Sequence, residues 1–138
     1  MGWQRSVRMD RLELGRRGER RARWFYRLRG FRVVEANLRI GRGELDLVAR
    51  RGWLVVVAEV KTRQSLAAGH GFEAVGRAKQ LQLVRLAGAY LARLRDPRVE
   101  LRYDVVSLYW TGWRFVVTHF PDAFRPVSDA RAPWRWSV

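Results

Sequence analysis

Two apolar segments on either side of a short polar turn constrain this fold more than any other feature. Residues 45–49 and 53–60 read LDLVA and WLVVVAEV, and the tripeptide RRG separates them. Both segments have the length and the valine-rich composition of strands. Glycine favours the first central position of a type II′ turn, so we expect Gly52 and Trp53 to connect a β-hairpin.

This turn fixes which residues of the hairpin lie opposite one another. The expected pairs are Arg51–Leu54, Ala49–Val56, Leu47–Ala58 and Leu45–Val60. All of these positions except Arg51 are apolar, so this face of the hairpin is predicted to be core. A one-residue bulge would move every side chain beyond it to the other face.

Charged side chains gather on the other face, at the end away from the turn. Asp46 falls opposite Glu59, and Glu44 falls opposite Lys61. Opposed side chains on antiparallel strands have Cβ atoms about 4.5–5.5 Å apart. Two carboxylates at this separation repel each other, so that one is driven to bind a proton unless a cation lies between them.

A divalent cation between Asp46 and Glu59 would remove this repulsion. Mg2+ prefers oxygen ligands and is often held by one or two carboxylates together with waters and a substrate phosphate. Lys61 points the same way as Glu59 and would lie beside the attacking water and the scissile phosphate. This set of groups is typical of phosphodiester hydrolysis. A surface ion-pair network of the same three side chains is the alternative.

Lysine is rare in this strongly basic chain. The formal net charge is +15, and of the 28 basic residues only Lys61 and Lys79 are lysine. An ammonium group is compact and tunable whereas a guanidinium is broad and always charged, so the two lysines indicate positions where arginine would fail. The charge favours nucleic acid as partner over a membrane surface, with a solubilising surface as the alternative.

Length and composition limit the class of protein. The chain has 138 residues and no cysteine, which predicts one domain without disulfides. Its longest clean apolar run, residues 53–58, is too short to span a membrane, and the arginine-rich N-terminus lacks the core of a signal peptide. We therefore expect a cytoplasmic protein with no membrane partner. A monomer and a homodimer are both left open.

The residue periodicity predicts an α/β fold, a mixed β-sheet flanked by helices in the order α-β-β-β-α-β-β. Helices are expected at residues 10–29 and 72–94, and strands at 31–35, 45–49, 53–60, 100–109 and 113–119. Residues 37–43 are expected to form a polar connection. The resulting organisation is a domain of residues 1–120 followed by an irregular tail, 121–138.

The segments GELDLVA (43–49) and EVKTR (59–63) resemble the motifs of the PD-(D/E)xK superfamily of restriction-endonuclease-like folds. They are more closely similar to the bacterial YraN-like family, relatives of archaeal Holliday junction resolvases. The resemblance covers about residues 12–120 and extends to Gly18-Glu19 with Ala22, Asn37-Leu38-Arg39, Ala74-Val75 with Lys79, and Tyr103-Asp104-Val105-Val106. The C-terminal segment 132–138 has no counterpart in it.

This resemblance implies a restriction-endonuclease-like fold and a Mg2+- or Mn2+-dependent endonuclease. Asp46 and Glu59 would be metal ligands, Lys61 would assist the attacking water, and Glu19 from the first helix would complete the site. The substrate would be nucleic acid, with DNA expected ahead of RNA and branched DNA as a candidate. Basic side chains expected to contact it are Arg39, Arg42, Arg63 and Lys79. A catalytically silent binding module or adaptor with the same fold is the alternative.

Three of these residues have a plainer interpretation from sequence. Glu19 could form a solvated ion pair with Arg23, one helical turn further on. Lys79 lies on the core-side stripe of its predicted helix and could simply contact phosphate or extend its ammonium to solvent. Asp104 lies inside a predicted strand, and we expect it to be structural.

Overall fold

The computed structural model describes residues 9–64, 75–129 and 132–137. Along this part of the chain the elements are α1 (Arg11–Arg27), β1 (Arg32–Ile40), β2 (Gly43–Arg51), β3 (Leu54–Arg63), α2 (Arg77–Leu94), β4 (Glu100–Trp110), β5 (Phe115–Asp129) and β6 (Ala132–Ser137). The predicted order α-β-β-β-α-β-β is confirmed, and β6 is an additional strand after it.

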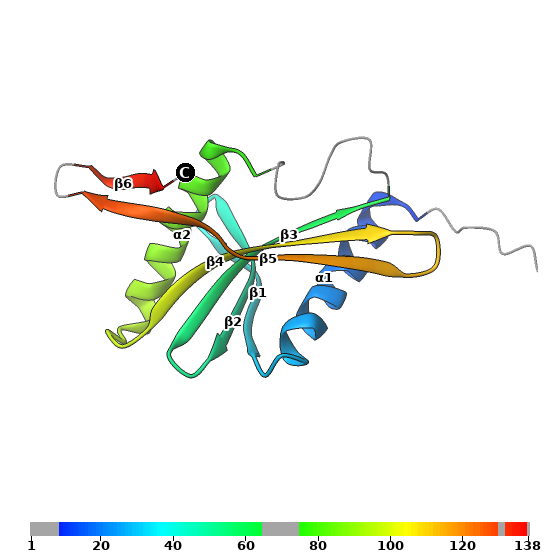
Figure 1. Cartoon of the computed structure of the whole chain (residues 1–138), viewed down its shortest axis with the longest axis horizontal. Coiled ribbons are helices and arrows are strands. Elements are labelled where there is room, and N and C mark those ends of the chain that lie inside the picture. The colour runs from blue at the N-terminus through cyan, green and yellow to red at the C-terminus, as the bar shows by residue number, and fades with distance from the viewer. Residues whose placement is uncertain (1–8, 65–74, 130–131, 138) are drawn as a thin grey trace, which may run out of the picture.

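The strands form a mixed sheet in the order β1-β2-β3-β4-β5-β6 (Figure 1). Neighbouring strands are antiparallel except β3 and β4, which are parallel. Parallel neighbours need a crossover connection, and α2 lies within the one that joins β3 to β4. The predicted α/β class, a mixed sheet with flanking helices, is therefore confirmed.

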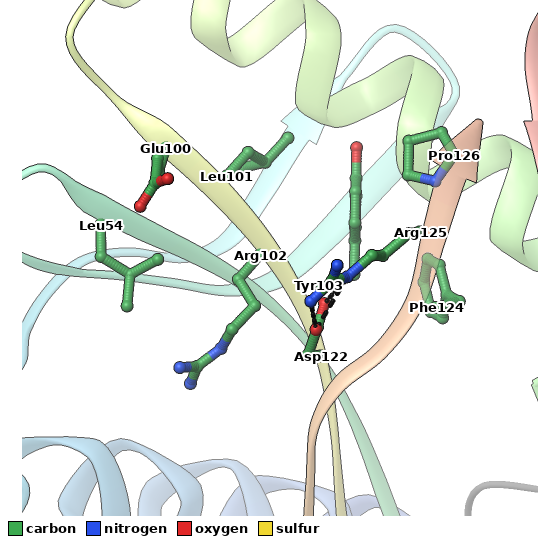
Figure 2. Close-up of a pocket in the computed structure, with 9 residues that line it drawn as sticks. All are labelled: Leu54, Glu100, Leu101, Arg102, Tyr103, Asp122, Phe124, Arg125 and Pro126. Atoms are coloured by element: carbon green, nitrogen blue, oxygen red, sulfur yellow. Dashed lines mark hydrogen bonds and ion pairs between the residues drawn. The ribbon is translucent and has the colours of Figure 1, made fainter. Parts of the chain in front are cut away.

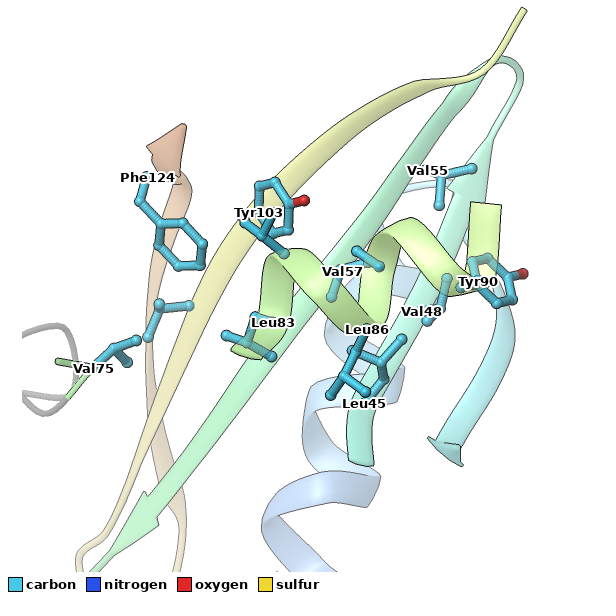
Figure 3. Close-up of a cluster of buried hydrophobic side chains, with 13 residues drawn as sticks. Leu45, Val48, Val55, Val57, Val75, Leu83, Leu86, Tyr90, Tyr103 and Phe124 are labelled. Atoms are coloured by element: carbon cyan, nitrogen blue, oxygen red, sulfur yellow. The ribbon is translucent and has the colours of Figure 1, made fainter. Parts of the chain in front are cut away.

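Each face of the central strands is covered by one helix. Val48, Val55 and Val57 belong to a buried cluster that packs against α2 (Figure 3). Their chain neighbours Ala49 and Val56 belong to a second cluster on the α1 side. Burial on both faces explains why β3 begins as a continuous apolar run rather than as an alternating one.

The ends of α1 follow from its sequence. Asp10 caps the helix, because its Oδ1 accepts a hydrogen bond from the backbone N–H of Glu13 at 2.9 Å. Gly30, just beyond the helix, has a φ of 83°, which glycine adopts without strain. The expected helix at 10–29 is confirmed to within two residues at each end.

The β2–β3 hairpin has the predicted register next to its turn. Arg51 pairs with Leu54, and Ala49 pairs with Val56. Gly52 has a φ of 59°, whereas Trp53 is not among the residues with positive φ. This combination fits a type II′ turn, which needs positive φ only at its first central residue.

The expected polar connection at residues 37–43 is wrong. β1 continues to Ile40 and β2 begins at Gly43, so that only Gly41 and Arg42 connect them. β1 is an edge strand, where polar side chains can face solvent without breaking the ladder. Asn37 within it has a φ of 52°, a conformation that asparagine tolerates better than most residues.

The second helix begins later than predicted. α2 starts at Arg77, with Gly76 in an extended conformation before it. Of the residues expected to precede it in the helix, 72–74 lie outside the described part of the chain. Among the described residues, no helix is long and apolar enough to cross a membrane.

The expected irregular tail from Pro121 is also wrong. β5 continues through Pro121 to Asp129, and β6 pairs with it. The register between β4 and β5 shifts between Tyr103 and Val105, where β5 carries extra residues opposite Asp104. Proline has no N–H to donate, and a bulge is one of the few places in a sheet that accepts it.

Candidate active site

Asp46 lies where the pairing between β2 and β3 stops. The last backbone pair is Leu47 with Ala58, and beyond it the backbone N–H of Val60 donates a hydrogen bond to Asp46 Oδ2 at 3.0 Å. The predicted pair Leu45–Val60 is absent from the ladder. Leu45 packs against α2, whereas Leu47 packs on the α1 side. The Asp46 carboxylate thus takes the place of a backbone acceptor at this interruption.

Glu59, on β3, lies beside Asp46 of β2 and is only 4% exposed. Burial raises the pKa of Asp46 to about 7, with the negative charge of Glu59 as the next cause and the Val60 hydrogen bond opposing both. The two carboxylates therefore resist being ionised together. This is the electrostatic condition that a bound cation would relieve.

Both lysines of the chain lie next to Glu59. Lys61 Nζ is 3.5 Å from Glu59 Oε1, and Lys79 Nζ is 3.7 Å from the same oxygen. Lys61 comes from β3 itself, and Lys79 comes from the first turn of α2. About a third of each lysine side chain is exposed, so both ammonium groups can also face a ligand in solvent.

The other Glu59 oxygen, Oε2, is buried and has no hydrogen-bond partner among the described residues. An unsatisfied buried carboxylate oxygen is costly, because it has lost its water without gaining a donor. Such groups are uncommon in folded proteins and often mark an ion, a water or a catalytic role.

Glu19, on α1, contacts β1, the strand next to β2. Asn37 Nδ2 donates a hydrogen bond to Glu19 Oε2 at 3.0 Å. Pairing on either side, Ala36 with Leu47 and Leu38 with Leu45, puts Asn37 opposite Asp46. Glu19 is thus linked to the neighbourhood of Asp46 through Asn37, a residue that the sequence motifs include but to which sequence reasoning gave no role.

Close contact between α1 and β3 holds Glu19 in this place. A Cβ atom built on Gly18 would lie 2.2 Å from Thr62 Oγ1, so only glycine fits there. Thr62 directly follows Lys61 on β3. Gly43 plays a similar part on the other face, since a Cβ there would lie 2.7 Å from Leu86 Cδ1 of α2.

The basic residues expected to contact nucleic acid do not all gather at this site. Lys79 reaches Glu59, as described. Arg39, near the end of β1, and Arg42, in the β1–β2 turn, are exposed at the end of β2 that carries Asp46. Arg63 is half-buried at the end of β3. Within the described ranges, no group of three or more Asp, Glu, His or Cys side chains is arranged to hold a metal ion.

Asp104 is fully buried on β4 and has a different environment from Glu59. Arg102 donates two hydrogen bonds to it at 2.8 Å, and Tyr26 and the backbone N–H of Asp122 donate at 2.8 and 3.0 Å. His119 Nε2 is 2.8 Å from Oδ2. Burial alone raises the Asp104 pKa, but these hydrogen bonds together hold it well below its usual range. Asp104 is structural, as expected.

A pocket of about 460 Å³ lies where β3 and β4 begin, at the end of the sheet away from Asp46 and Glu59. Figure 2 shows its lining, which comprises Leu54, Glu100, Leu101, Arg102, Tyr103, Asp122, Phe124, Arg125 and Pro126. Its two guanidinium groups have carboxylate partners: Arg102 pairs with Asp104, and Arg125 pairs with Asp122. We therefore assign the candidate site to the carboxylate pair and not to this pocket.

The fold and the site define an α/β domain with two adjacent carboxylates and two lysines around one strand end. The chain belongs to the family described as Uncharacterised protein family UPF0102, whose model matches residues 18–108. That range contains Glu19, Asp46, Glu59, Lys61 and Lys79.

Curated relatives have the same family name. A UPF0102 protein of Syntrophotalea carbinolica is 44% identical over 115 residues, which are 83% of this chain and 94% of that protein. One from Arthrobacter sp. is 49% identical over 98 residues, covering 69% of this chain and 80% of the relative. One from Chlorobaculum tepidum is 42% identical over 95 residues, which are 69% of this chain and 74% of that relative.

Proposed function

We propose that this protein is a nucleic-acid-binding phosphodiesterase of the endonuclease type that depends on Mg2+ or Mn2+. The observation that carries the proposal is the environment of Glu59. It is a buried carboxylate beside a second carboxylate, with two ammonium groups near one oxygen and, within the described part of the chain, no hydrogen-bond partner for the other. A surface ion-pair network would not leave a buried oxygen unsatisfied.

The residues present fit a divalent cation. Asp46 and Glu59 supply the carboxylate oxygens that Mg2+ prefers, and Glu59 Oε2 has no hydrogen-bond partner among the described residues. Two protein carboxylates suffice for Mg2+, which completes its shell with water and substrate phosphate. When bound, the ion would activate an attacking water and stabilise the charge that develops on the phosphate.

The remaining groups of the site have separate tasks in this proposal. The backbone N–H of Val60 fixes the orientation of the Asp46 carboxylate. Lys61, two residues beyond Glu59, donates hydrogen bonds to the attacking water or to the scissile phosphate, and Lys79 holds the phosphate from the α2 side. Glu19, which accepts a hydrogen bond from Asn37, would complete the site from α1.

Nucleic acid is the proposed substrate because of charge. The chain carries +15, and Arg39 and Arg42 are exposed at the end of β2 that carries Asp46. A phosphodiester backbone supplies both the negative charge that binds this surface and the bond that the site would cut. DNA remains our preferred form, with branched DNA as the first substrate to try.

A nuclease assay with matched variants tests the proposal. Wild type, Asp46→Asn and Glu59→Gln are incubated with single-stranded, duplex and four-way-junction DNA, with Mg2+, with Mn2+ and with chelator. We expect metal-dependent cleavage by wild type only, while both variants still bind DNA. Arg23→Gln, a charge change on α1, is the control and should keep the activity.

The rival is a binding module that retains the fold and does not cut. The absence of a third acidic or histidine ligand among the described residues favours it. It predicts DNA binding by wild type without cleavage under any metal, and no effect of Asp46→Asn on metal affinity measured by calorimetry. That pair of results would refute the phosphodiesterase proposal.

A further inference from the structure

The turn between β4 and β5 lies beyond the candidate site at the same end of the sheet. Glu59 pairs with Val105, Lys61 with Ser107 and Arg63 with Tyr109. β4 runs on to Trp110, which pairs with Phe115 of β5. Three residues of strand, about 10 Å, therefore separate Ser107 from the start of the turn. In Figure 1 this turn lies near the end of β3.

This turn is held in one shape. The backbone N–H of Thr111 donates to the carbonyl of Arg114 at 3.0 Å, and Thr111 Oγ1 donates to the same carbonyl at 3.2 Å. Below it, the rings of Trp110 and Phe115 are 4.9 Å apart. Gly112 has a φ of 113°, a conformation that glycine alone adopts easily.

The fixed turn presents an exposed indole. Trp113 is 57% exposed, Arg114 next to it is exposed, and Val116 on β5 is 41% exposed. The chain's other exposed indoles of the described part are Trp24 and Trp53, and each has an arginine guanidinium over its ring, at 5.4 and 4.1 Å. Within the described ranges, no arginine guanidinium lies over the ring of Trp113.

We infer that the β4–β5 turn, through Trp113, is a stacking surface for an unpaired nucleotide of the nucleic acid that enters the site. An aromatic ring on a rigid turn can stack on any base, because every base has a π-face. The neighbouring Arg114 and the net charge of +15 attract the phosphates on either side of that base. The stacked bases of a duplex do not offer a face to the indole, so the preferred partner is a single strand or a strand junction.

The distance fits one continuous strand. Nucleotides in a stacked strand rise 3.4 Å each. A base stacked on Trp113 would thus lie about three or four nucleotides from a phosphate at Lys61. This inference rests on the proposed function, because it assigns the form of substrate that the same site would accept.

Two tryptophans at opposite ends of the sheet give a matched comparison. Trp53 is 52% exposed at the β2–β3 turn, and Trp113 is 57% exposed at the β4–β5 turn. Wild type, Trp113→Leu, Trp113→Phe and Trp53→Leu are titrated into fluorescein-labelled dT20 and into a 20-base-pair duplex, and anisotropy is measured. Circular dichroism melts establish that each variant is folded.

We expect Trp113→Leu to weaken dT20 binding about five- to one-hundred-fold while duplex binding changes less than about twofold. Trp113→Phe should retain most of the affinity, because it keeps an aromatic face. Trp53→Leu should bind both probes like wild type. The inference would be overturned if Trp113→Leu and Trp53→Leu lost the same affinity for dT20. It would also be overturned if Trp113→Leu lost as much affinity for the duplex as for dT20.

The same titrations separate the inference from the proposed function. Wild type that binds and cleaves DNA, with Trp113→Leu unchanged on dT20, refutes the stacking role and leaves the phosphodiesterase proposal standing. Wild type that binds neither probe refutes both. A Trp113→Leu protein that fails to fold, with Trp113→Phe folded and weak on dT20, also counts against stacking, because phenylalanine should stack.

Discussion

Glu59 and Asp104 are both buried and lie on the adjacent parallel strands β3 and β4. Their carboxylate oxygens differ in how many hydrogen-bond donors they have. Asp104 accepts hydrogen bonds on both oxygens. Glu59 has two ammonium groups near one oxygen, and its other oxygen has no hydrogen-bond partner among the residues that the structure describes. Asp104 pairs with Ala58, the residue before Glu59 on β3. Because successive side chains of a strand point to opposite faces, Glu59 and Asp104 face different sides of the sheet. The Asp104 carboxylate holds strands and helix together, whereas Glu59 is the carboxylate to which we assign the proposed ligand.

Replacing Asp46 by asparagine should not destabilise the metal-free protein. The change removes a half-buried carboxylate whose pKa is raised to about 7, and asparagine can still accept the Val60 hydrogen bond. We expect the free energy of unfolding at pH 7.5 to stay equal or rise by about 1–2 kcal/mol, measured by urea denaturation. A structural ion-pair network predicts a clear decrease instead.

The same variant should lose stabilisation by metal. A ligand that binds only the folded state raises the free energy of unfolding by RT ln(1 + [L]/Kd). We expect millimolar Mn2+ to raise the melting temperature of wild type and to leave Asp46→Asn unchanged. If Mn2+ leaves the melting temperature of wild type unchanged, that result would count against metal binding at this site.

Lys61→Arg should lose cleavage while it keeps nucleic-acid binding. The planar guanidinium carries the same charge, but it is too broad to occupy the place of an ammonium 3.5 Å from Glu59 Oε1. We expect a fall of about a hundredfold or more in cleavage rate, with affinity changed less than about threefold. Arg42→Lys is the reciprocal control and should keep both properties. Equal cleavage by Lys61→Arg would show that Lys61 supplies only charge.

Binding to DNA should depend steeply on salt and little on sequence. Neutralising Z phosphates gives a log–log slope of about −0.9Z for duplex DNA, and six to ten contacts would cost about 10³–10⁵ in affinity between 50 and 200 mM salt. Anisotropy titrations on two duplexes of unrelated sequence measure both properties. An affinity that barely changes with salt would contradict the electrostatic interpretation.

Gly18→Ala and Gly15→Ala should have opposite effects, although both lie in α1. A Cβ on Gly18 meets Thr62 Oγ1 at 2.2 Å, whereas a Cβ on Gly15 meets no described residue within 4 Å. We expect Gly18→Ala to destabilise by about 1–3 kcal/mol and Gly15→Ala to stabilise by about 0.5–1 kcal/mol through helix propensity. Denaturation of the two variants checks both signs, and equal effects would mean that α1 does not contact β3 so closely.

Asp104→Asn should be strongly destabilising at neutral pH and less so in acid. The hydrogen bonds that lower the Asp104 pKa stabilise the ionised form, so this stability is present above the unfolded-state pKa of about 3.9 and is lost as pH falls below it. At pH 7 we expect a loss of about 3–5 kcal/mol, because Arg102 keeps a half-buried charge without its partner.

The control for this change is an exposed ion pair. Glu13 is paired with Arg17 at 2.8 Å, and about half of each side chain is exposed. Glu13→Gln should cost only about 0.3–0.5 kcal/mol. Comparable losses for the Glu13 and Asp104 variants would show that the buried network contributes little.

Local sequence was sufficient for the elements whose signals lie within a few residues. Asp10 and Gly30 mark the ends of α1, and Gly52 fixes the register of the hairpin beside it. Sequence failed at β1 and β5, because their polar residues and prolines argue against a strand unless a neighbouring strand, an edge or a bulge accommodates them. Pro121 lies in β5 only because the register shift at Asp104 removes the need for its N–H.

The sequence by itself determined which chemical groups the candidate site contains, since Asp46, Glu59 and Lys61 lie on two strands joined by one short turn. Only the tertiary structure decided that Lys79 approaches the same Glu59 oxygen as Lys61. It also decided that Asn37 connects Glu19 to β1, the strand beside Asp46. In the same way, it gave Asp104 hydrogen-bond donors on both of its oxygens. Those contacts join residues that are distant along the chain. They depend on how closely helices pack on the sheet, which is set by Gly18 against Thr62 and by Gly43 against Leu86.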